Sequence, residues 1–481
     1  MKRIITSLAI TLILNNSSFA QSILQQRIKQ VENSLTENLR TQDAAAFNLQ
    51  KRMEYYKVKG LSIAVIKDYK IDWAKAYGLS DAESKTPVTV STLFQAASIS
   101  KSLNAVGVMK LFSSRNLNLF ADINTYLSSW KFPYDSLSGG KKINVANLLS
   151  HTAGLSIHGF GGYEQGSPLP SAIQILNGDK PANSDPVRSV FAPGLRQQYS
   201  GGGITITQLL MTDISKQPYE QYMEQQVLRP LGMRSSTFAQ PPVGKKLNAL
   251  ATGYDTDGNE IKGKYHLYPE QAAAGLWTNP TDLGKYIIET QLAYAGKSDK
   301  VLDQQSTKLR LSPYENSEAA LGVFIEDYDG LKYFGHGGSN EGFQSGYYGS
   351  LQDGNGLVIM VNSDNGQIIQ ELINSIATVY NFKGLNKSRT IKLAHVTSSE
   401  LDKYLGKYQL TPDLVLTITR EGKQLYAQAT GQTKLEAYPE TSTKFLFKVI
   451  HATMEFIKDD KGKVTKMMFT QGSTIEAKRL E

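Results

Sequence analysis

Two strand patterns at opposite ends of a long helical stretch set the strongest limit on this fold. The first, LSIAVIKDYKIDWAKAYG at residues 61–78, alternates apolar and polar residues around a turn at Asp68, which predicts a β-hairpin. The second covers residues 319–365, where several strand-like runs are separated by Gly and Asp turns. Helical patterns dominate from Ser98 to about Leu231. We therefore expect one sheet closed by distant segments, with a helical layer beside it.

A second domain is predicted because the composition changes near the end of the chain. At 481 residues the chain exceeds one typical domain. A polar segment without periodicity follows Phe382, and short alternating strands recur from Leu401 onward. The sequence therefore predicts a main domain over residues 21–383, a linker over residues 384–397 and a small all-β domain over residues 398–481.

The N-terminus has the layout of a secretory signal. Lys2 and Arg3 precede an apolar run from Ile4 to Leu14, and small residues end at Ala20. The run is roughly half of the ~20 apolar residues that a membrane span needs, so residues 1–20 are predicted to be cleaved and not to remain as an anchor. The chain has no cysteine, which suits a bacterial envelope protein without disulfides. We expect the periplasm, with full secretion as the alternative.

The mature chain has the character of an ordinary soluble protein. Apolar residues at helical spacing predict an amphipathic helix from Gln21 to about Leu49. No later segment is apolar enough to predict a membrane span. The formal net charge is +8, but basic and acidic residues are interspersed, so we expect no nucleic-acid partner.

Several catalytic classes lack their signatures. The six histidines never fall at i, i+4 spacing with a glutamate, so no metal site is predicted. The Gly-x-Ser-x-Gly pentapeptide of lipase-type hydrolases does not occur. No Lys-Ser/Thr pair follows Gly166, so the glycine-rich segment before it is not a phosphate loop and is predicted to border a cleft. We therefore expect neither a metal nor an organic cofactor.

The segment FQAASISKSLNAVGVMKLF contains a chemically suggestive pair, Ser98 and Lys101. A serine hydroxyl is a poor nucleophile at neutral pH and needs an adjacent base. Residues at i and i+3 share a helix face, so the amine points at the hydroxyl if a helix begins near Ser98. The positive end of that helix would favour the developing anion. The spacing also occurs by chance, and Ser100 and Ser102 are competing hydroxyls, so other motifs must decide.

Two further segments supply companions for this pair. PGLRQQYSGGGITITQLL places Tyr199 on a turn before a predicted helix, where its phenol would shuttle protons if cations lowered its pKa. YFGHGGSNEGF places His336 after a strand, and Gly337 and Gly338 let a substrate backbone approach closely. Taken singly, the tyrosine is equally well a core residue and the histidine a structural or surface residue.

In this order, the segments resemble the three active-site motifs of the serine β-lactamase and penicillin-binding-protein superfamily. The motifs read Ser98-Ile99-Ser100-Lys101, Tyr199-Ser200-Gly201 and His336-Gly337-Gly338. NLLSHTAGL, residues 147–155, is similar to a segment of the class C β-lactamase-like branch, which includes D-aminopeptidases, D-alanyl carboxypeptidases and esterases. The resemblance implies an α/β (α+β) fold with a central antiparallel sheet, flanking helices and a helical subdomain.

The resemblance also implies a role for each residue. Ser98 would be the acylated nucleophile, Lys101 its base or proton relay, and Tyr199 the general base of the class C type. The backbone N–H groups of Ser98 and Ser339 would form the oxyanion hole. His336 would replace the lysine of the third motif. Whether Lys101 or Tyr199 takes the serine proton stays open.

Two positions depart from the superfamily pattern. Gly201 stands where the second motif usually has an asparagine that helps to bind the substrate's amide, although Gly201 is still expected beside the substrate. His336, with Gly337, Gly338 and Ser339, is predicted to bind substrate, and it replaces a fixed positive charge facing a substrate carboxylate with a titratable one. Both changes favour a peptidase or esterase over a dedicated antibiotic-resistance enzyme.

Two other residues are open to more than one interpretation. His151, inside NLLSHTAGL, is predicted to hydrogen-bond backbone and fix a loop, because Ser98 already has nearer candidate bases. Trp277 is predicted to be either a cleft residue or a core aromatic.

Together these features predict an exported serine hydrolase that forms an acyl-enzyme on Ser98. Its substrate would be a small molecule or short peptide with an amide or ester bond: a β-lactam, a D-amino-acid peptide or a small ester. The alternative is a non-turnover, penicillin-recognising binding or sensor protein with the same fold. The C-terminal domain resembles the lipocalin-like β domain often attached to these hydrolases. Whether it covers the active-site mouth or stabilises an assembly stays open, as does the oligomeric state.

Overall fold

The computed structural model describes residues 21–480, apart from residues 43, 316, 412, 413, 433, 449 and 451. The predicted signal peptide, residues 1–20, lies outside the described residues. The chain divides into two compact units, one formed by Leu49–Gly384 and the other by the segment before Leu49 together with the chain from Leu385 onward. Within the described part of the chain, no helix combines the length and apolar character of a membrane span.

An antiparallel sheet of seven strands lies at the centre of the Leu49–Gly384 unit, in the order β4-β3-β2-β10-β9-β8-β7. Leu61 in β2 pairs with Val361 in β10, so the two distant strand regions close one sheet as predicted. The hairpin is confirmed as well, since β2 and β3 join at Asp68 and Tyr69, whose φ angles of 52° and 61° suit a tight turn. The strands are β2 (Gly60–Lys67), β3 (Lys70–Asp81), β4 (Thr86–Pro87), β7 (Phe324–Tyr328), β8 (Leu331–Asn340), β9 (Phe343–Ser350) and β10 (Gly356–Val361).

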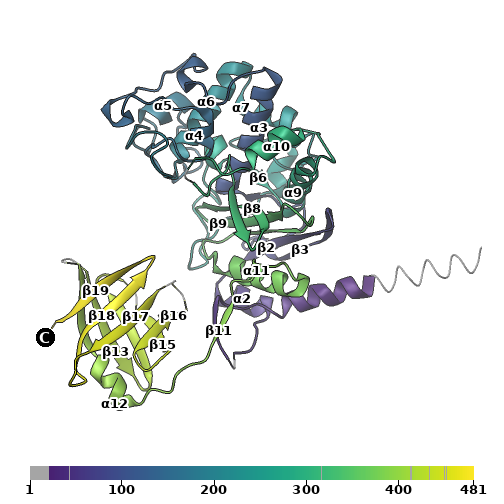
Figure 1. The fold of residues 1–481 in the computed structure, drawn as a ribbon. Helices are drawn as coiled ribbons and strands as arrows, with labels where there is room; N and C mark the ends of the chain where they lie inside the picture. Colours follow the sequence, from purple (N-terminus) through teal and green to yellow (C-terminus); the bar gives the residue numbers. More distant parts are fainter. Residues whose placement is uncertain are drawn as a thin grey trace, which may run out of the picture. The chain divides into compact units, whose positions relative to one another are not determined.

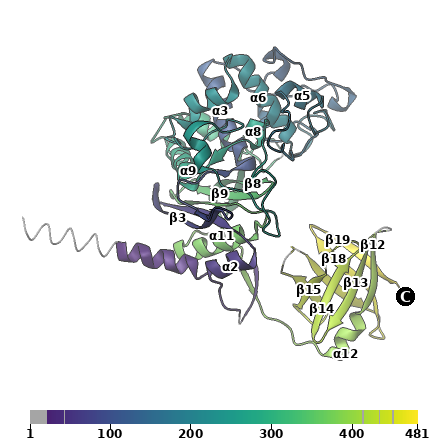
Figure 2. The ribbon, with the colours of Figure 1, turned by 180° about the vertical axis from the view of Figure 1, so that it is seen from behind.

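Helices cover both faces of this sheet (Figures 1 and 2). Helices α2 and α11 lie on one face, and the larger helical layer, which includes α3, α6 and α9, lies on the other. The helices are α2 (Leu49–Tyr55), α3 (Ser100–Ser114), α4 (Val145–Leu149), α5 (Ala172–Asn177), α6 (Gly201–Ser215), α7 (Tyr219–Met223), α8 (Gln271–Ala274), α9 (Pro280–Tyr294), α10 (Gln304–Arg310) and α11 (Gln367–Tyr380). This is the predicted arrangement of a central sheet, flanking helices and a helical subdomain.

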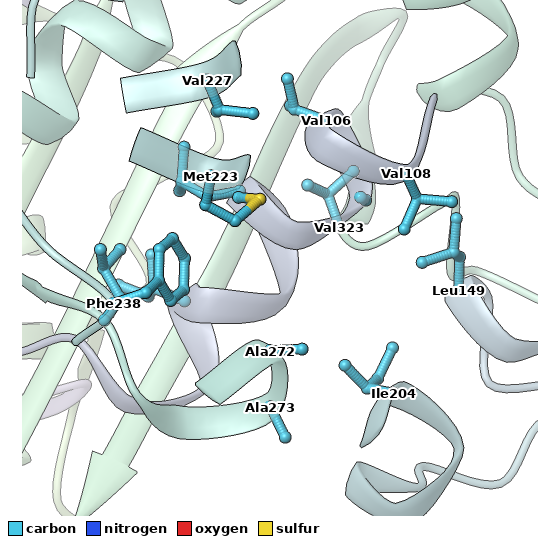
Figure 3. Packing of buried hydrophobic residues seen from close by; sticks show 14 of the residues in the cluster. Val106, Val108, Leu149, Ile204, Met223, Val227, Phe238, Ala272, Ala273 and Val323 are labelled. Carbon is cyan, nitrogen blue, oxygen red and sulfur yellow. The ribbon is translucent and has the colours of Figure 1, made fainter. Parts of the chain in front are cut away.

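Helix α3 runs through the middle of the helical layer. Every residue from Ser100 to Met109 is buried, which is typical of a helix packed on all sides. Figure 3 shows Val106 beside Met223, with Ile204 and Leu149 from neighbouring helices in the same apolar cluster. The first turn of α3 is therefore held in place by the surrounding core.

The N-terminal segment differs from the prediction. Residues 21–32 are helical, but the helix does not reach Leu49, because β1 (Leu39–Thr41) pairs in parallel with β11 (Arg389–Ile391). Leu39 and Ile391 share a small apolar cluster with Leu446. The division into units differs from the predicted boundary at residue 21, because the segment before Leu49 is grouped with the C-terminal unit, and the predicted linker over residues 384–397 contains the strand β11.

The C-terminal unit contains the predicted all-β domain as a closed antiparallel barrel. Lys407 in its first strand pairs with Leu480 in its last, which closes the barrel. Buried side chains fill its interior, and the Tyr404 ring stacks on Phe456 at 4.3 Å. The strands are β12 (Gly406–Thr411), β13 (Leu414–Glu421), β14 (Gln424–Ala429), β15 (Leu435–Pro439), β16 (Lys444–Phe447), β17 (Thr453–Lys458), β18 (Val464–Gln471) and β19 (Ser473–Leu480), and α12 (Ser398–Leu401) precedes them.

Candidate active site

Ser98 lies in a single 3₁₀ turn, η1 (Ala97–Ile99), directly before α3. Ala97 has a φ of 50°, a left-handed conformation that a residue with a Cβ adopts only when its surroundings enforce it. Strand β8 abuts this turn so closely that a Cβ atom on Gly338 would lie 2.1 Å from the Ala96 carbonyl oxygen. Only glycine fits there, so the turn and the third motif are held against each other.

Lys101 makes the contact that the sequence predicts. Its Nζ lies 2.9 Å from Ser98 Oγ and donates to it, and also donates to the Ala273 carbonyl at 2.7 Å. The side chain is 2% exposed, and this burial lowers the pKa of the amine to about 7. A substantial fraction of Lys101 is therefore neutral near pH 7. In that form one N–H still donates to the Ala273 carbonyl, while the nitrogen lone pair can accept a hydrogen bond from the Ser98 hydroxyl.

The competing serines on α3 have structural roles. Ser100 Oγ accepts the Leu276 N–H at 2.9 Å, and Ser102 Oγ donates to the Gly322 carbonyl at 3.0 Å. Both side chains are fully buried, so neither competes with Ser98.

Tyr199 is positioned by His151, which fixes the loop before α6. The Ser200 N–H donates to His151 Nδ1 at 3.2 Å, and the Gln198 N–H donates to the His151 carbonyl at 2.8 Å. The centroids of the His151 and Tyr199 rings lie 4.2 Å apart. Burial and the nearby Lys101 charge hold the pKa of His151 well below its usual value, so it stays neutral. These hydrogen bonds agree with the structural role predicted for His151.

The Tyr199 ring lies next to both partners of the first motif. Lys101 Nζ is 5.0 Å from its centroid, and Tyr199 lines the same cleft as Ser98. Burial raises the pKa of Tyr199 to about 12, and the Ser98 hydroxyl only partly opposes this. The condition under which the sequence made Tyr199 a proton shuttle, a pKa lowered by cations, is not met, because desolvation is the larger effect. Tyr199 is therefore protonated at neutral pH.

His336 enters the same cleft from β8. Its Nδ1 lies 2.5 Å from the Gly337 carbonyl, which fixes the proton on Nδ1 and leaves Nε2 as an acceptor with no partner. Burial, with a further contribution from Lys101, lowers the pKa of His336 to about 3. At neutral pH His336 is therefore uncharged, whereas the sequence predicted a positive charge there that titrates with pH.

The three motifs meet in one cleft with a volume of about 810 Å³. Seven of the eight predicted site residues line it: Ser98, Lys101, Tyr199, His336, Gly337, Gly338 and Ser339. Strand β7 pairs with β8 only as far as Gly335, so residues 336–340 have a free edge on that side, beside η1. The eighth, Gly201, is buried at the start of α6 and does not line the cleft, contrary to expectation.

Comparison with known proteins agrees with this geometry. The β-lactamase family matches residues 46–375, which is most of the chain. The chain belongs to the β-lactamase family. Residues 392–480, which include the barrel of this β-lactamase-family protein, match a second family described as a domain of unknown function, DUF3471.

Individual relatives are distant. A Staphylococcus aureus (strain MW2) protein called "Protein flp" is 25% identical over 75% of this chain and 69% of its own length. A Pseudomonas fluorescens "Beta-lactamase" is 30% identical over 57% of this chain and 71% of its own. The octameric penicillin-binding protein homologue from Pyrococcus abyssi has a similar fold, with a TM-score of 0.61 and 21% identity over 89% of this chain and 98% of its own.

Sequence reasoning missed several residues that shape the cleft of this β-lactamase-family protein. His158, Phe160 and Phe324 line it, and Phe324 lies 5.3 Å from His336 and stacks beside Tyr199 at 6.5 Å, between centroids. The long glycine-rich loop hinted at the first two, whereas no motif marks Phe324. Trp277 belongs to the core, because it is fully buried between other aromatic rings.

The described residues contain no group of three or more His, Asp or Glu side chains placed to hold a metal ion.

Proposed function

We propose that this protein is a serine hydrolase that transfers the acyl group of an ester or amide to Ser98 and then to water. The observation that carries the proposal is the 2.9 Å contact between Ser98 Oγ and the buried amine of Lys101. A hydroxyl next to an amine with a pKa of about 7 can lose its proton at neutral pH. A scaffold that needed only structural stability would gain nothing from burying a lysine there.

The proton path that we propose assigns different tasks to the two candidate bases. Neutral Lys101 takes the Ser98 proton as Oγ bonds to the carbonyl carbon. Tyr199, protonated at neutral pH, passes a proton to the leaving oxygen or nitrogen as its bond to the carbonyl carbon breaks, and is reprotonated from Lys101. Water then repeats the sequence on the acyl-enzyme, with Ser98 as leaving group. No proton is gained or lost over the cycle.

The oxyanion would be held by backbone N–H groups. We assign them to Ser98, at the start of the α3 region, and to Ser339, on the free edge of β8 beside η1. The closeness of Gly338 to the Ala96 carbonyl supports this pairing. Two such donors aimed at the position of the developing negative charge stabilise a tetrahedral intermediate strongly.

Covalent labelling tests the proposal directly. The protein is treated with a fluorophosphonate and, separately, with a fluorescent penicillin, and the labelled peptide is identified by mass spectrometry. We expect the adduct on Ser98 and its loss in Ser98→Ala. Ser113→Ala is the matched control, because Ser113 is an exposed serine on the same helix. Labelling that persists in Ser98→Ala would refute the assignment.

Turnover separates the hydrolase from a sensor. Ser98-dependent hydrolysis of p-nitrophenyl esters, nitrocefin or D-alanyl peptides supports the hydrolase and ranks its substrates. A stable Ser98 adduct without turnover of any of them would support a binding or sensor protein instead. We also propose export to the periplasm or beyond, from the N-terminal pattern of residues 1–20. N-terminal sequencing of the mature protein after expression tests cleavage at Ala20.

A further inference from the structure

Residues 156–160, called the cleft loop below, pack against the first turn of α6. The Gly201 N–H donates to the His158 carbonyl at 3.0 Å, and the Gly202 N–H donates to the Ile157 carbonyl at 3.1 Å. N–H groups at a helix start have no partner within the helix. The cleft loop supplies those partners and is held in one position by them.

The glycines of the second motif make room for this loop. A Cβ atom on Gly201 would lie 3.1 Å from the His158 carbonyl oxygen and 3.1 Å from the Phe160 ring. A Cβ on Gly202 would lie 2.7 Å from Val187. An asparagine at position 201 would therefore press its Cβ against the Phe160 ring and the His158 carbonyl. This explains why the second motif departs from its usual form.

The cleft loop contains a strained backbone conformation. Ile157 is β-branched and has a φ of 59°, which is a true outlier for such a residue. Strain of this kind persists only where the surrounding structure enforces it, and it gathers at functional sites. The next residue, His158, lies with its ring centroid 4.8 Å from that of Tyr199, and both His158 and Phe160 line the cleft.

The cleft is poor in charge. Among the described residues that line it, Lys101 is the one lysine, and no arginine, aspartate or glutamate is present. Lys101 is occupied by Ser98 and the Ala273 carbonyl. The unpartnered His336 Nε2 offers a lone pair, which attracts a donor and repels an anion. A substrate carboxylate would lose its water here without a dedicated cation to replace it.

We propose that the cleft selects uncharged acyl compounds that carry an aromatic ring, such as aryl esters, and that the cleft loop sets this selectivity by placing Phe160 against Gly201, where the asparagine side chain is missing. The inference rests on the acyl transfer to Ser98 proposed above. The ring would lie among Phe160, Tyr199 and Phe324.

A matched pair of substrates tests the charge selectivity. Methyl 4-acetoxybenzoate and 4-acetoxybenzoate share the acetyl group and the ring, and differ by one carboxylate. We expect kcat/KM to be at least about tenfold higher for the methyl ester, after correction for the hydroxide-catalysed rates, because each tenfold corresponds to ~1.4 kcal/mol and an uncompensated carboxylate loses more. Equal rates, or faster hydrolysis of the acid, would overturn the inference.

The variant His336→Lys tests the charge selectivity independently. His336→Lys adds a cation on β8, so the preference for the methyl ester should fall at least severalfold or reverse. An unchanged ratio in a folded His336→Lys protein would count against the charge argument. If this variant does not fold, the wild-type pair still decides.

The role of the cleft loop is tested with Phe160→Ala. We expect the ratio of kcat/KM for phenyl acetate over vinyl acetate to fall roughly 3–10-fold, in line with the loss of an aromatic contact. Phe120→Ala is the matched control, since Phe120 is 51% exposed and does not line the cleft. An unchanged ratio in Phe160→Ala would remove the cleft loop from substrate selection.

These outcomes separate the inference from the function beneath it. Hydrolysis that depends on Ser98 but ignores substrate charge overturns only the inference. Hydrolysis that persists in Ser98→Ala overturns the proposed function. A protein that hydrolyses nitrocefin or D-alanyl peptides through Ser98 but neither benzoate ester also overturns only the inference.

Discussion

The pH dependence of acylation should identify the group that takes the Ser98 proton, because three candidates in the cleft have widely separated pKa values. Burial places the pKa of His336 at about 3, that of Lys101 at about 7 and that of Tyr199 at about 12. A general base acts in its deprotonated form, so activity is present above its pKa and is lost as the pH falls through it.

If Lys101 is the base, kcat/KM should level off above pH 8 and fall tenfold per pH unit below 7. At pH 5 about 1% of an amine with this pKa is neutral, so we expect roughly a 100-fold loss. Methyl 4-acetoxybenzoate is the suitable substrate, because it does not ionise in this range. Its kcat/KM reports on the free enzyme, whose pKa values are those given above.

The assay is initial-rate hydrolysis from pH 4 to pH 10 at constant ionic strength, with circular dichroism at each pH to confirm that the protein stays folded. Lys101→Arg should be inactive throughout, since arginine stays protonated. Lys110→Arg, at the far end of α3 and outside the cleft, should keep the wild-type profile. Activity that stays level down to pH 4 would refute Lys101 as the base and assign that role to His336, and activity that still rises tenfold per pH unit up to pH 10 would assign it to Tyr199.

Three further predictions follow from buried groups. Tyr199→Phe should lower kcat/KM by ~10²-fold while leaving the circular dichroism spectrum unchanged, because only the proton relay is lost; near-wild-type rates would remove the phenol from the mechanism. Arg52→Met leaves the buried Glu371 carboxylate with the Tyr56 hydroxyl but without the Arg52 guanidinium, which donates to it at 2.7 Å. The free energy of unfolding should fall by about 3–5 kcal/mol in urea titrations, against about 0–1 kcal/mol for Lys57→Met in an exposed pair. Burial raises the pKa of Glu270 to about 8, so folding favours its protonated form, and the free energy of unfolding declines by up to about 1.4 kcal/mol per pH unit as the pH rises from about 4.5 to 8. Glu270→Gln should therefore raise the calorimetric unfolding temperature more at pH 8 than at pH 5, and an equal gain at both would contradict this.

The sequence predicted the elements whose signals are local or repeated. The alternation in residues 61–78 identified the hairpin, the short strands beyond Leu401 identified the barrel, and the spacing of Ser98 and Lys101 predicted their contact. Each of these depends on residues close together in the chain, or on periodicity that survives without knowledge of partners.

What sequence reasoning missed depends on contacts between distant segments. The helix predicted from Gln21 ends earlier than expected because residues 39–41 pair with β11. The sequence pattern around residues 39–41 does not indicate that distant strand. The burial of Gly201 beneath Phe160 and the direction of the Tyr199 pKa shift are also properties of packing. Desolvation follows from how many neighbours surround a group, which the order of residues does not specify.

The closure of the sheet by β10 also fixes when reactivity can arise during biosynthesis. Ser98 and Lys101 leave the ribosome well before β8 and β10 have been synthesised. Gly338 in β8 packs closely against the turn that contains Ser98, and β10 pairs with β2 in the sheet. In the unfinished chain the Lys101 amine is exposed to solvent and protonated, so the Ser98 hydroxyl is as unreactive as that of any other serine. Labelling of Ser98 should therefore be silent in nascent or C-terminally truncated chains that end before β10, and its appearance would time the completion of the fold.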